Sequence, residues 1–554
     1  MRPLRLSGES QFNVLRIGVL LFMAAGAYGQ EATLVIENAR VIVGDGTVKD
    51  SATVVIAGKR ITAVSAESAP PDAAKRIDAR GMTLMPGLID THIHFFGLTA
   101  RGEAAFRAQI ETLAPKYLKD FLRYGVTTVK SLADPLDLVL ELRTQVREGR
   151  LPGPRILLVG PCFTAPGGHP AVTLGQDDPW MRSEIGIEVD DEDTARREVR
   201  RLAAKGVDAI KAALEAGGGT GMPETMPRLS VEVLRAIVDE AHQHKLRVTV
   251  HTHREQDVID AVASGADGVE HGVSSATLSD DKVANALLDG NVAYTPTLWI
   301  MSQDRETESF EIAKRNLKTL SDKGVRIIVG TDTLCSMPSP GLNTIQETEF
   351  MAQAGLTPER IIRAGTRDAA EHLGLLADLG TVEAGKIADL VLVGGDPLKD
   401  IARLHQVQMV IKEGRIVYDA DEETAAAQGV PSDCNPVSWF EIPVTDMPRA
   451  RAFYERVLNV RLRPLNLGPL EMALFPLRPG TPGAGGALMK GEAFQPSQQG
   501  VQIYFFTPDV DGPLERVQKL GGKVVLAKTR IGLFGFIASF EDSEGNRIGL
   551  RSWQ

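Results

Sequence analysis

The segment PGLIDTHIH, residues 86–94, places two histidines two positions apart directly after an apolar run. If this segment is a strand, His92 and His94 point to the same side of it, as two ligands of one metal ion would. A lone pair of this kind also occurs on ordinary core or surface strands. Further candidate ligands follow similar apolar segments along the chain: Lys211, His251, His253, His271 and Asp332. Imidazole nitrogens and a carboxylate oxygen are ordinary ligands of zinc-like cations, so the whole set predicts a metal centre.

The elements that must position these residues alternate between short apolar strands and amphipathic helices over residues 86–378. Eight strand candidates are present: GLIDTHIH, GVTTVKSL, RILLVG, GVDAIKAAL, RVTVHTH, DGVEHG, VAYTPTL and RIIVGTD. This alternation is typical of an α/β protein with a (β/α)8 TIM barrel. In that fold the chemistry lies at the C-terminal ends of the strands, which is where the candidate ligands lie.

Three further parts of the chain surround this barrel. Residues 30–85 and 379–420 are both rich in short alternating strands, and we expect them to form one small β-sandwich built from both flanks. Residues 421–436 have the composition of a linker. Residues 437–554 contain a weak internal repeat of two strand–helix–strand units, which predicts a separate C-terminal α+β domain.

Composition limits the possible functions. The 554 residues are 43% hydrophobic and 24% charged, which is typical of a soluble globular protein of two or three domains. A net charge of -11 argues against a nucleic-acid partner. Three cysteines are too few for a disulfide framework.

The N-terminal residues 1–29 have the layout of a secretory signal peptide. Three arginines precede the apolar run IGVLLFMAAGAY, and small residues follow before Gln30. An uncleaved anchor or a fortuitous apolar stretch is the alternative. We therefore expect a secreted or periplasmic protein with no stable membrane insertion after cleavage, because no other run approaches transmembrane length.

Residues 32–420 resemble the amidohydrolase superfamily. The resemblance rests on PGLIDTHIH, the lysine of GVDAIK, VHTH, GVEHG, GTD and the closing GTVEAGKIADLVLV. The chain is most similar to the prolidase-like and imidazolonepropionase-related group of metal-dependent hydrolases. This resemblance implies a barrel with a binuclear metal centre, usually zinc, and a β-sandwich from both chain ends.

The resemblance also implies a role for each ligand. His92 and His94 would bind one divalent ion, with Asp332 as a further ligand, and His251 and His271 would bind the second. Lys211 matches the carboxylated lysine of the family, whose carbamate bridges the two ions. A buried ammonium beside two divalent cations would be costly, so the modification is favoured if the ions are present.

Other residues near the expected barrel mouth have less certain roles. His253 could contact substrate, support His251 or be structural, whereas Gly168 and His169 of TAPGGHP resemble a substrate-binding loop. An ordinary turn is the alternative for that loop. Glu347 resembles a recurrent helix acid of the group, but Ile345 stands where relatives often have histidine.

The implied reaction is metal-assisted hydrolysis of an amide-type C–N bond. Two ions would activate a bridging water and polarise the carbonyl, while Asp332 accepts the proton and passes it to the leaving nitrogen. Dipeptides such as Xaa-Pro and N-acyl amino acids are the first expected substrates. Lactones, cyclic amides and phosphotriesters remain open, because relatives on the same scaffold cleave them.

Residues 437–554 resemble the vicinal oxygen chelate (glyoxalase/bleomycin-resistance) fold. By motif spacing, Trp439 and Gln502 stand where metal-binding histidines are usual, and Gly549 stands where a glutamate is common. Glu441 remains as one possible ligand. We therefore expect a small-molecule binding cup or a dimerisation module, and the opposing hypothesis for the whole chain is a small-molecule binding protein acting through this domain. Homo-oligomerisation stays open.

Overall fold

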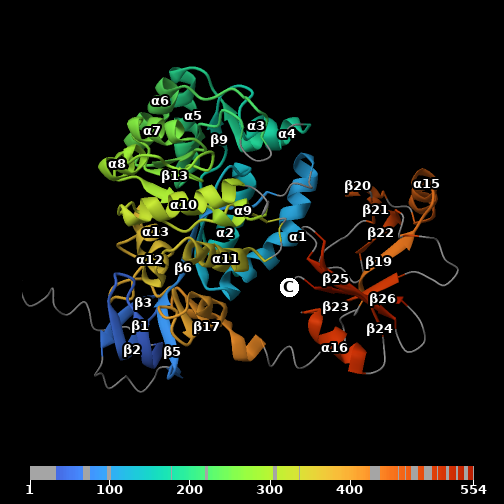
Figure 1. Ribbon diagram of the computed structural model, residues 1–554. Helices are drawn as coiled ribbons and strands as arrows, with labels where there is room; N and C mark the ends of the chain where they lie inside the picture. The colour runs from blue at the N-terminus through green and yellow to red at the C-terminus, as the bar shows by residue number, and fades with distance from the viewer. Residues whose placement is uncertain are drawn as a thin grey trace, which may run out of the picture.

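A computed structural model shows a mixed α/β protein (Figure 1). It describes residues 33–65, 75–96, 101–175, 177–218, 222–303, 308–335, 337, 339–423 and, with several gaps, 437–552. The expected signal peptide and most of the expected linker lie outside these residues. Within the described residues, no helix combines the length and the apolar character needed to cross a membrane.

The two flanking segments join in one eight-stranded sheet. Its strands are β1 (Leu34–Ile42), β2 (Val48–Ala57), β3 (Arg60–Ser65), β4 (Lys75–Asp78), β5 (Met82–Pro86), β16 (Leu390–Gly394), β17 (Val407–Lys412) and β18 (Arg415–Asp419). The order is β18-β17-β16-β5-β1-β2-β3, with β4 paired to β1. The antiparallel pairing of β5 with β16 places the two flanks of the barrel in one sheet.

The barrel strands follow the alternation read from the sequence. They are β6 (Leu88–His94), β7 (Val126–Ser131), β8 (Arg155–Leu158) with its continuation β9 (Cys162–Thr164), β11 (Ala209–Ala213), β12 (Arg247–His251), β13 (Gly268–Glu270) and β14 (Ala293–Thr295). The eighth expected strand is a short extended segment near Ile328. Its backbone closes the barrel, because Ile328 N–H donates to Tyr294 O at 3.0 Å and Thr91 N–H donates to Val329 O at 2.9 Å.

Helices connect and cover these strands (Figure 1). The longer ones are α1 (Gly102–Arg123), α2 (Leu136–Arg147), α5 (Glu192–Lys205), α6 (Val231–Gln243), α7 (Glu255–Ala263), α8 (Lys282–Asp289), α10 (Glu308–Asp322) and α11 (Pro340–Gln353). Shorter elements are α3 (Ala171–Leu174), α4 (Pro179–Ile185), β10 (Gly186–Glu188), α9 (Leu298–Met301), β15 (Thr333–Leu334), α12 (Pro358–Ala364), α13 (Arg367–His372) and η1 (Ile401–His405). Helix α5 shows how local sequence sets the ends: Asp191 accepts a hydrogen bond from Thr194 N–H, and Gly206 ends the helix in the left-handed region at φ 78°.

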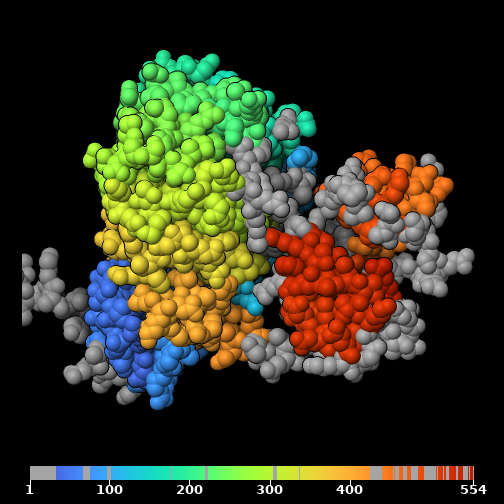
Figure 2. Space-filling view, viewed as in Figure 1, coloured from blue at the N-terminus to red at the C-terminus, as the bar shows by residue number. Residues whose placement is uncertain are grey.

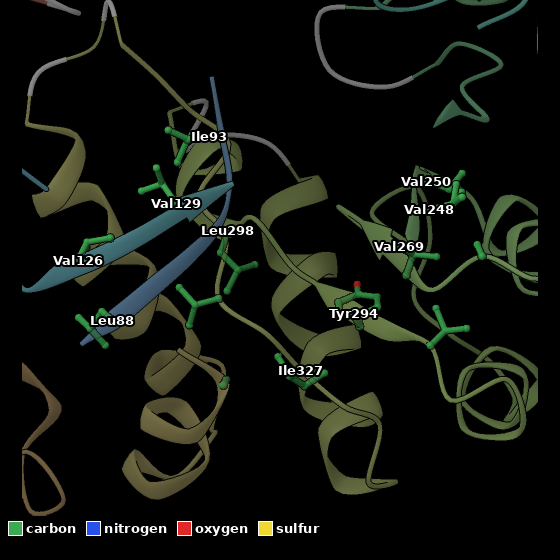
Figure 3. Packing of buried hydrophobic residues seen from close by; sticks show 14 of the residues in the cluster. Leu88, Ile93, Val126, Val129, Val248, Val250, Val269, Tyr294, Leu298 and Ile327 are labelled. Carbon is green, nitrogen blue, oxygen red and sulfur yellow. The ribbon is translucent and has the colours of Figure 1, made fainter. Parts of the chain in front are cut away.

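The main hydrophobic core lies between the barrel strands and these helices. Apolar side chains from successive strands, among them Leu88, Val126, Val248 and Val269, are fully or almost fully buried in one cluster (Figure 3). Burial of this kind fixes the strand ends, and so it fixes the side chains that the ends carry.

The C-terminal residues form a second eight-stranded sheet with its own hydrophobic clusters. In the space-filling view the described residues of this part are orange and red (Figure 2). Its elements are β19 (Val437–Pro443), α15 (Met447–Leu458), β20 (Arg463–Leu467), β21 (Leu470–Leu474), β22 (Gly485–Lys490), β23 (Gln502–Phe506), α16 (Asp511–Lys519), β24 (Lys523–Arg530), β25 (Phe536–Glu541) and β26 (Arg547–Ser552). The order β20-β21-β22-β19-β23-β26-β25-β24 is two copies of one four-strand pattern meeting at β19 and β23. The repeat read from the sequence is therefore a real structural repeat.

Candidate metal centre

A cavity of about 480 Å³ lies at the C-terminal ends of the barrel strands. Six of the ten histidines of the chain line it, together with one lysine and two carboxylates. These nine residues are His92, His94, His169, Lys211, Glu215, His251, His253, His271 and Asp332. The cavity brings together every candidate ligand read from the barrel segment of the sequence.

His92, His94 and Asp332 form the tightest group. One candidate ligand atom from each lies within 4.8 Å of the others. Asp332 Oδ1 is 2.7 Å from His94 Nε2 and 3.3 Å from His92 Nε2. The Nδ1–H of His94 donates to the carbonyl of Leu132, which leaves Nε2 as the nitrogen free to bind an ion.

His251 and His271 lie beside this group, with ring centroids 4.4 Å apart. His271 Nδ1 is 3.9 Å from Asp332 Oδ2 and 2.8 Å from the hydroxyl of Thr297. His251 Nε2 is 3.2 Å from Glu215 Oε2, so the acceptor carboxylate leaves Nδ1 of His251 available. These two rings supply a second set of nitrogen ligands next to the first set.

Two of the ligand residues owe their direction to unusual backbone geometry. His271 and Asp332 follow strand ends and adopt φ values of 66° and 58°, in the left-handed region that non-glycine residues rarely occupy. Backbone hydrogen bonds hold both positions: His271 N–H donates to Thr295 O at 2.9 Å, and Asp332 N–H donates to His92 O at 2.7 Å. The chain bends at each strand end and carries the side chain into the barrel mouth.

The surroundings of these side chains favour the protonation states that bind metal ions. Burial lowers the pKa of His92 to about 4, and the nearby Lys211 adds to this effect. Burial also holds the pKa of His271 well below its usual value. Burial alone would raise the pKa of Asp332, but the imidazoles of His92, His94 and His271 lower it far below the usual range. Neutral imidazoles and an ionised carboxylate are the forms that bind metal ions.

Lys211 lies beside the first group of candidate ligands. It lies on β11 with 4% of its surface exposed, and its Nζ is 3.2 Å from His92 Nε2. A buried ammonium here would oppose the binding of any cation, whereas a carbamate on the same nitrogen would provide two anionic oxygens. Cation binding beside His92 would therefore be favoured by a carbamate at Lys211 and opposed by an ammonium.

His253 and His169 also line the cavity, each held by a hydroxyl. His253 Nδ1 is 2.8 Å from Ser274 Oγ, and His169 Nδ1 is 2.7 Å from Thr173 Oγ1. Gly168 does not line the cavity. A side chain at Gly168 would place Cβ 2.4 Å from Thr164 Oγ1, so close packing of the turn accounts for this glycine.

Glu347 lies away from the ligands. Its carboxylate accepts hydrogen bonds from the backbone N–H groups of Leu298 and Trp299 at the start of α9. Cys162 and Cys335 are buried thiols, and burial raises the pKa of Cys162 to about 12.

Three charged residues of the site are absent from the sequence-based prediction. Glu215 contacts His251, Glu270 contacts His92, and Lys130 contacts Glu270. Lys130 is the last residue but one of the strand VTTVKS, and Glu270 is the last residue of the strand GVE. A charged residue at the C-terminal end of a barrel strand is the signal that could have found them. Glu215 follows β11 by two residues, at a strand end like the other site residues.

Comparison with known families now adds to this geometry. The sequence model of the amidohydrolase family matches residues 83–417, well over half of the chain. This chain belongs to the amidohydrolase family. It is therefore an enzyme, a hydrolase of carbon–nitrogen bonds, in a family whose members generally depend on metal ions.

Individual relatives of this amidohydrolase are known. The chain is 27% identical over 402 residues to ochratoxinase from Aspergillus niger, covering 65% of this chain and 81% of that protein. It is 28% identical over 394 residues to imidazolonepropionase from Caulobacter vibrioides, covering 63% and 88%. A solved Xaa-Pro dipeptidase with bound methionine in its active site is similar at a TM-score of 0.60 and 26% identity, covering 70% of this chain and all of that one.

The C-terminal domain of the amidohydrolase is of a second type. Residues 437–550 match the model of the glyoxalase/bleomycin resistance protein/dioxygenase superfamily. On its sheet, Glu441 is buried and accepts a hydrogen bond from the hydroxyl of Tyr504 at 3.4 Å. Trp439 and Gly549 both pair with Tyr504 in the sheet register, and Gln502 pairs with Glu441.

Proposed function

We propose that this protein is an exported, binuclear metal-dependent amidohydrolase that cleaves an amide-type C–N bond in a small molecule. The convergence of four histidines, Lys211 and Asp332 on one cavity is the observation that carries this proposal. Export rests on the signal-peptide pattern of residues 1–29.

In this proposal His92, His94 and Asp332 hold one divalent ion, and His251 and His271 hold the other. A carboxylated Lys211 would supply one oxygen ligand to each ion. Zinc is the expected metal, since nitrogen and carboxylate donors suit it. When bound, two such ions supply Lewis acidity and lower the pKa of water to near neutrality.

The protein's own residues then have defined tasks. The ionised Asp332 accepts a proton and delivers it to the leaving nitrogen. His169 and His253 orient the substrate. A hydroxyl holds each ring through Nδ1, and no partner within the described chain contacts Nε2, so that nitrogen is left to bind the substrate. Apolar side chains fill out the cavity wall and exclude water around the bond to be cleaved: Phe96, Leu174, Met222, Ile300, Met301 and Leu334.

The substrates expected for this cavity are N-acyl amino acids and dipeptides with a large apolar group. A volume of about 480 Å³ accommodates a molecule of that size. The names of the relatives, an ochratoxinase and an Xaa-Pro dipeptidase, support the same class of bond.

The test is a metal-reconstituted substrate screen. Protein stripped with chelator is assayed with and without zinc against Xaa-Pro dipeptides, N-acyl amino acids, lactones and phosphotriesters, with Asp332→Asn as the inactive control. We expect two zinc ions per chain and zinc-restored cleavage of amides. Purified protein that binds no metal and shows no metal-restored hydrolysis would contradict the proposal, and cleavage confined to lactones or phosphotriesters would reassign the substrate.

A further inference from the structure

A buried ion pair contacts the metal centre without lining the cavity. Glu270, on β13, has no exposed surface, and Lys130, on β7, is 1% exposed. Lys130 Nζ lies 3.2 Å from Glu270 Oε1, and the hydroxyl of Thr249 donates to the same oxygen at 2.5 Å. A substrate in the cavity would therefore not contact this pair.

The second oxygen of Glu270 has a different partner. Glu270 Oε2 lies 2.9 Å from Nδ1 of His92. A carboxylate can only accept this bond, so His92 must carry its proton on Nδ1. Its Nε2 is then unprotonated, and this nitrogen lies toward Asp332 and Lys211.

The two oxygens of Glu270 thus have different roles. Lys130 and Thr249 anchor Oε1, which fixes the carboxylate in place, and Oε2 fixes the ring of His92. A buried ion pair contributes little to the stability of a protein compared with apolar residues of the same volume. A contribution to stability therefore does not explain why Lys130 and Glu270 are present.

We propose that Glu270, anchored by Lys130, is a positioning residue that sets the tautomer and ring orientation of His92 before any metal ion binds. This inference rests on the proposed role of His92 as a metal ligand. His94 has a backbone acceptor, the carbonyl of Leu132, for the same purpose. His251 has Glu215. Each ring is therefore preset by an acceptor of its own.

The first experiment reads the tautomer directly in the metal-free wild-type protein. Nitrogen-15 NMR of labelled histidine distinguishes a ring protonated on Nδ1 from one protonated on Nε2, and His92→Gln assigns the signal by its loss. We expect His92 to be protonated on Nδ1. Protonation of His92 on Nε2 in the metal-free protein would overturn the inference, regardless of the zinc affinity measured for any variant.

The second experiment compares zinc binding in variants. Glu270→Gln combined with Lys130→Met removes both charges together and leaves an amide oxygen near His92, which avoids a single unpaired buried charge. We expect one of the two zinc equivalents to bind about 10–100-fold more weakly in chelator competition, and the His92 signal to show a mixture of tautomers. Glu347→Gln is the matched control, since it alters another fully buried glutamate that touches none of the ligands.

The outcomes separate the two proposals. Wild-type zinc affinity and an unchanged tautomer in the folded double variant would show that the ion pair is structural only. Failure of the wild type to bind zinc would contradict the proposed function, while the metal-free NMR measurement would still decide the inference. If the double variant does not fold, the wild-type tautomer remains the deciding measurement.

Discussion

Replacement of Lys211 tests the metal centre most directly. Lys211→Met keeps the apolar stem of a nearly buried side chain and removes only the nitrogen that lies 3.2 Å from His92 Nε2. We therefore expect the folded structure to persist and the bridging ligand to be lost. The larger truncation Lys211→Ala removes the bridge and also leaves a cavity.

The size of the effect follows from the ligand count. A four-ligand zinc site has an apparent binding free energy of about 10–16 kcal/mol, so one ligand corresponds to about 2.5–4 kcal/mol. Because a carbamate at Lys211 would serve both ions, each ion should bind about 10²–10³-fold more weakly. Dialysis against a weak chelator should then reduce the metal content from near two ions per chain to below one.

The assay is metal analysis by mass spectrometry after dialysis, together with the temperature of unfolding. Lys386→Met is the control, because this lysine donates to the carbonyls of Leu376 and Leu379 in the flanking region and touches no ligand. Two tightly held ions in Lys211→Met, at wild-type affinity, would refute the bridging role. Loss of metal in Lys386→Met would show that the assay reports on stability instead.

Four further predictions follow from particular contacts. Gly272→Ala should lower the free energy of unfolding in urea by about 3 kcal/mol or more, since φ is +71° and the added Cβ would lie 2.1 Å from the buried ring of Tyr294; a change below about 1 kcal/mol would contradict this. Burial raises the pKa of Asp120 to about 6, above its unfolded value of 3.8, so its contribution to stability is complete below pH 3.8 and is lost as the pH rises through 6. Asp120→Asn keeps an acceptor for Gly341 N–H and does not ionise. Its free energy of unfolding, measured in denaturant, should therefore rise by about 2–3 kcal/mol relative to that of the wild type between pH 4 and pH 7. A difference between variant and wild type that does not change with pH would refute the raised pKa. His253→Ala should reduce kcat/KM about 10–100-fold with both metal ions retained, as measured by steady-state kinetics and metal analysis, whereas loss of an ion would make His253 a ligand support. A chain ending at residue 423 should keep zinc-dependent amide hydrolysis within about twofold, because the C-terminal sheet has hydrophobic clusters of its own, and loss of activity in a folded truncated protein would assign the C-terminal domain a part in catalysis.

The strand pattern could be predicted from the sequence because buried parallel strands are continuous apolar runs. The run ending in His92 and His94 became β6, and the run ending in His251 became β12. The C-terminal repeat was equally visible, since each half begins with the same strand–helix order. These features depend on local composition, which the sequence contains in full.

The charged network around the ligands could not be predicted in the same way. Lys130 and Glu270 are 140 residues apart, and their contact exists only because β7 and β13 lie on one barrel. Each residue alone is a charged side chain near the end of a strand, which is equally consistent with a strand end at the surface. At Gly168 the sequence suggested close approach of a substrate, but the close neighbour of this glycine is Thr164, at the end of β9.

The left-handed backbone at two strand ends explains why the direction of His271 and Asp332 could not be predicted from the sequence, although their residue types could be read from it. His271 and Asp332 occupy left-handed conformations that glycine would adopt without strain, and each costs about 1–3 kcal/mol. If only stability mattered, glycine or asparagine would be favoured at such positions, because both adopt the left-handed conformation at low cost. The side chains at these two positions are instead an imidazole and a carboxylate that face the same cavity, so their chemistry outweighs the strain of holding them there. We therefore infer that the strain at these two positions serves the function of the barrel mouth, and that the hydrogen bonds which hold them support the proposed metal centre.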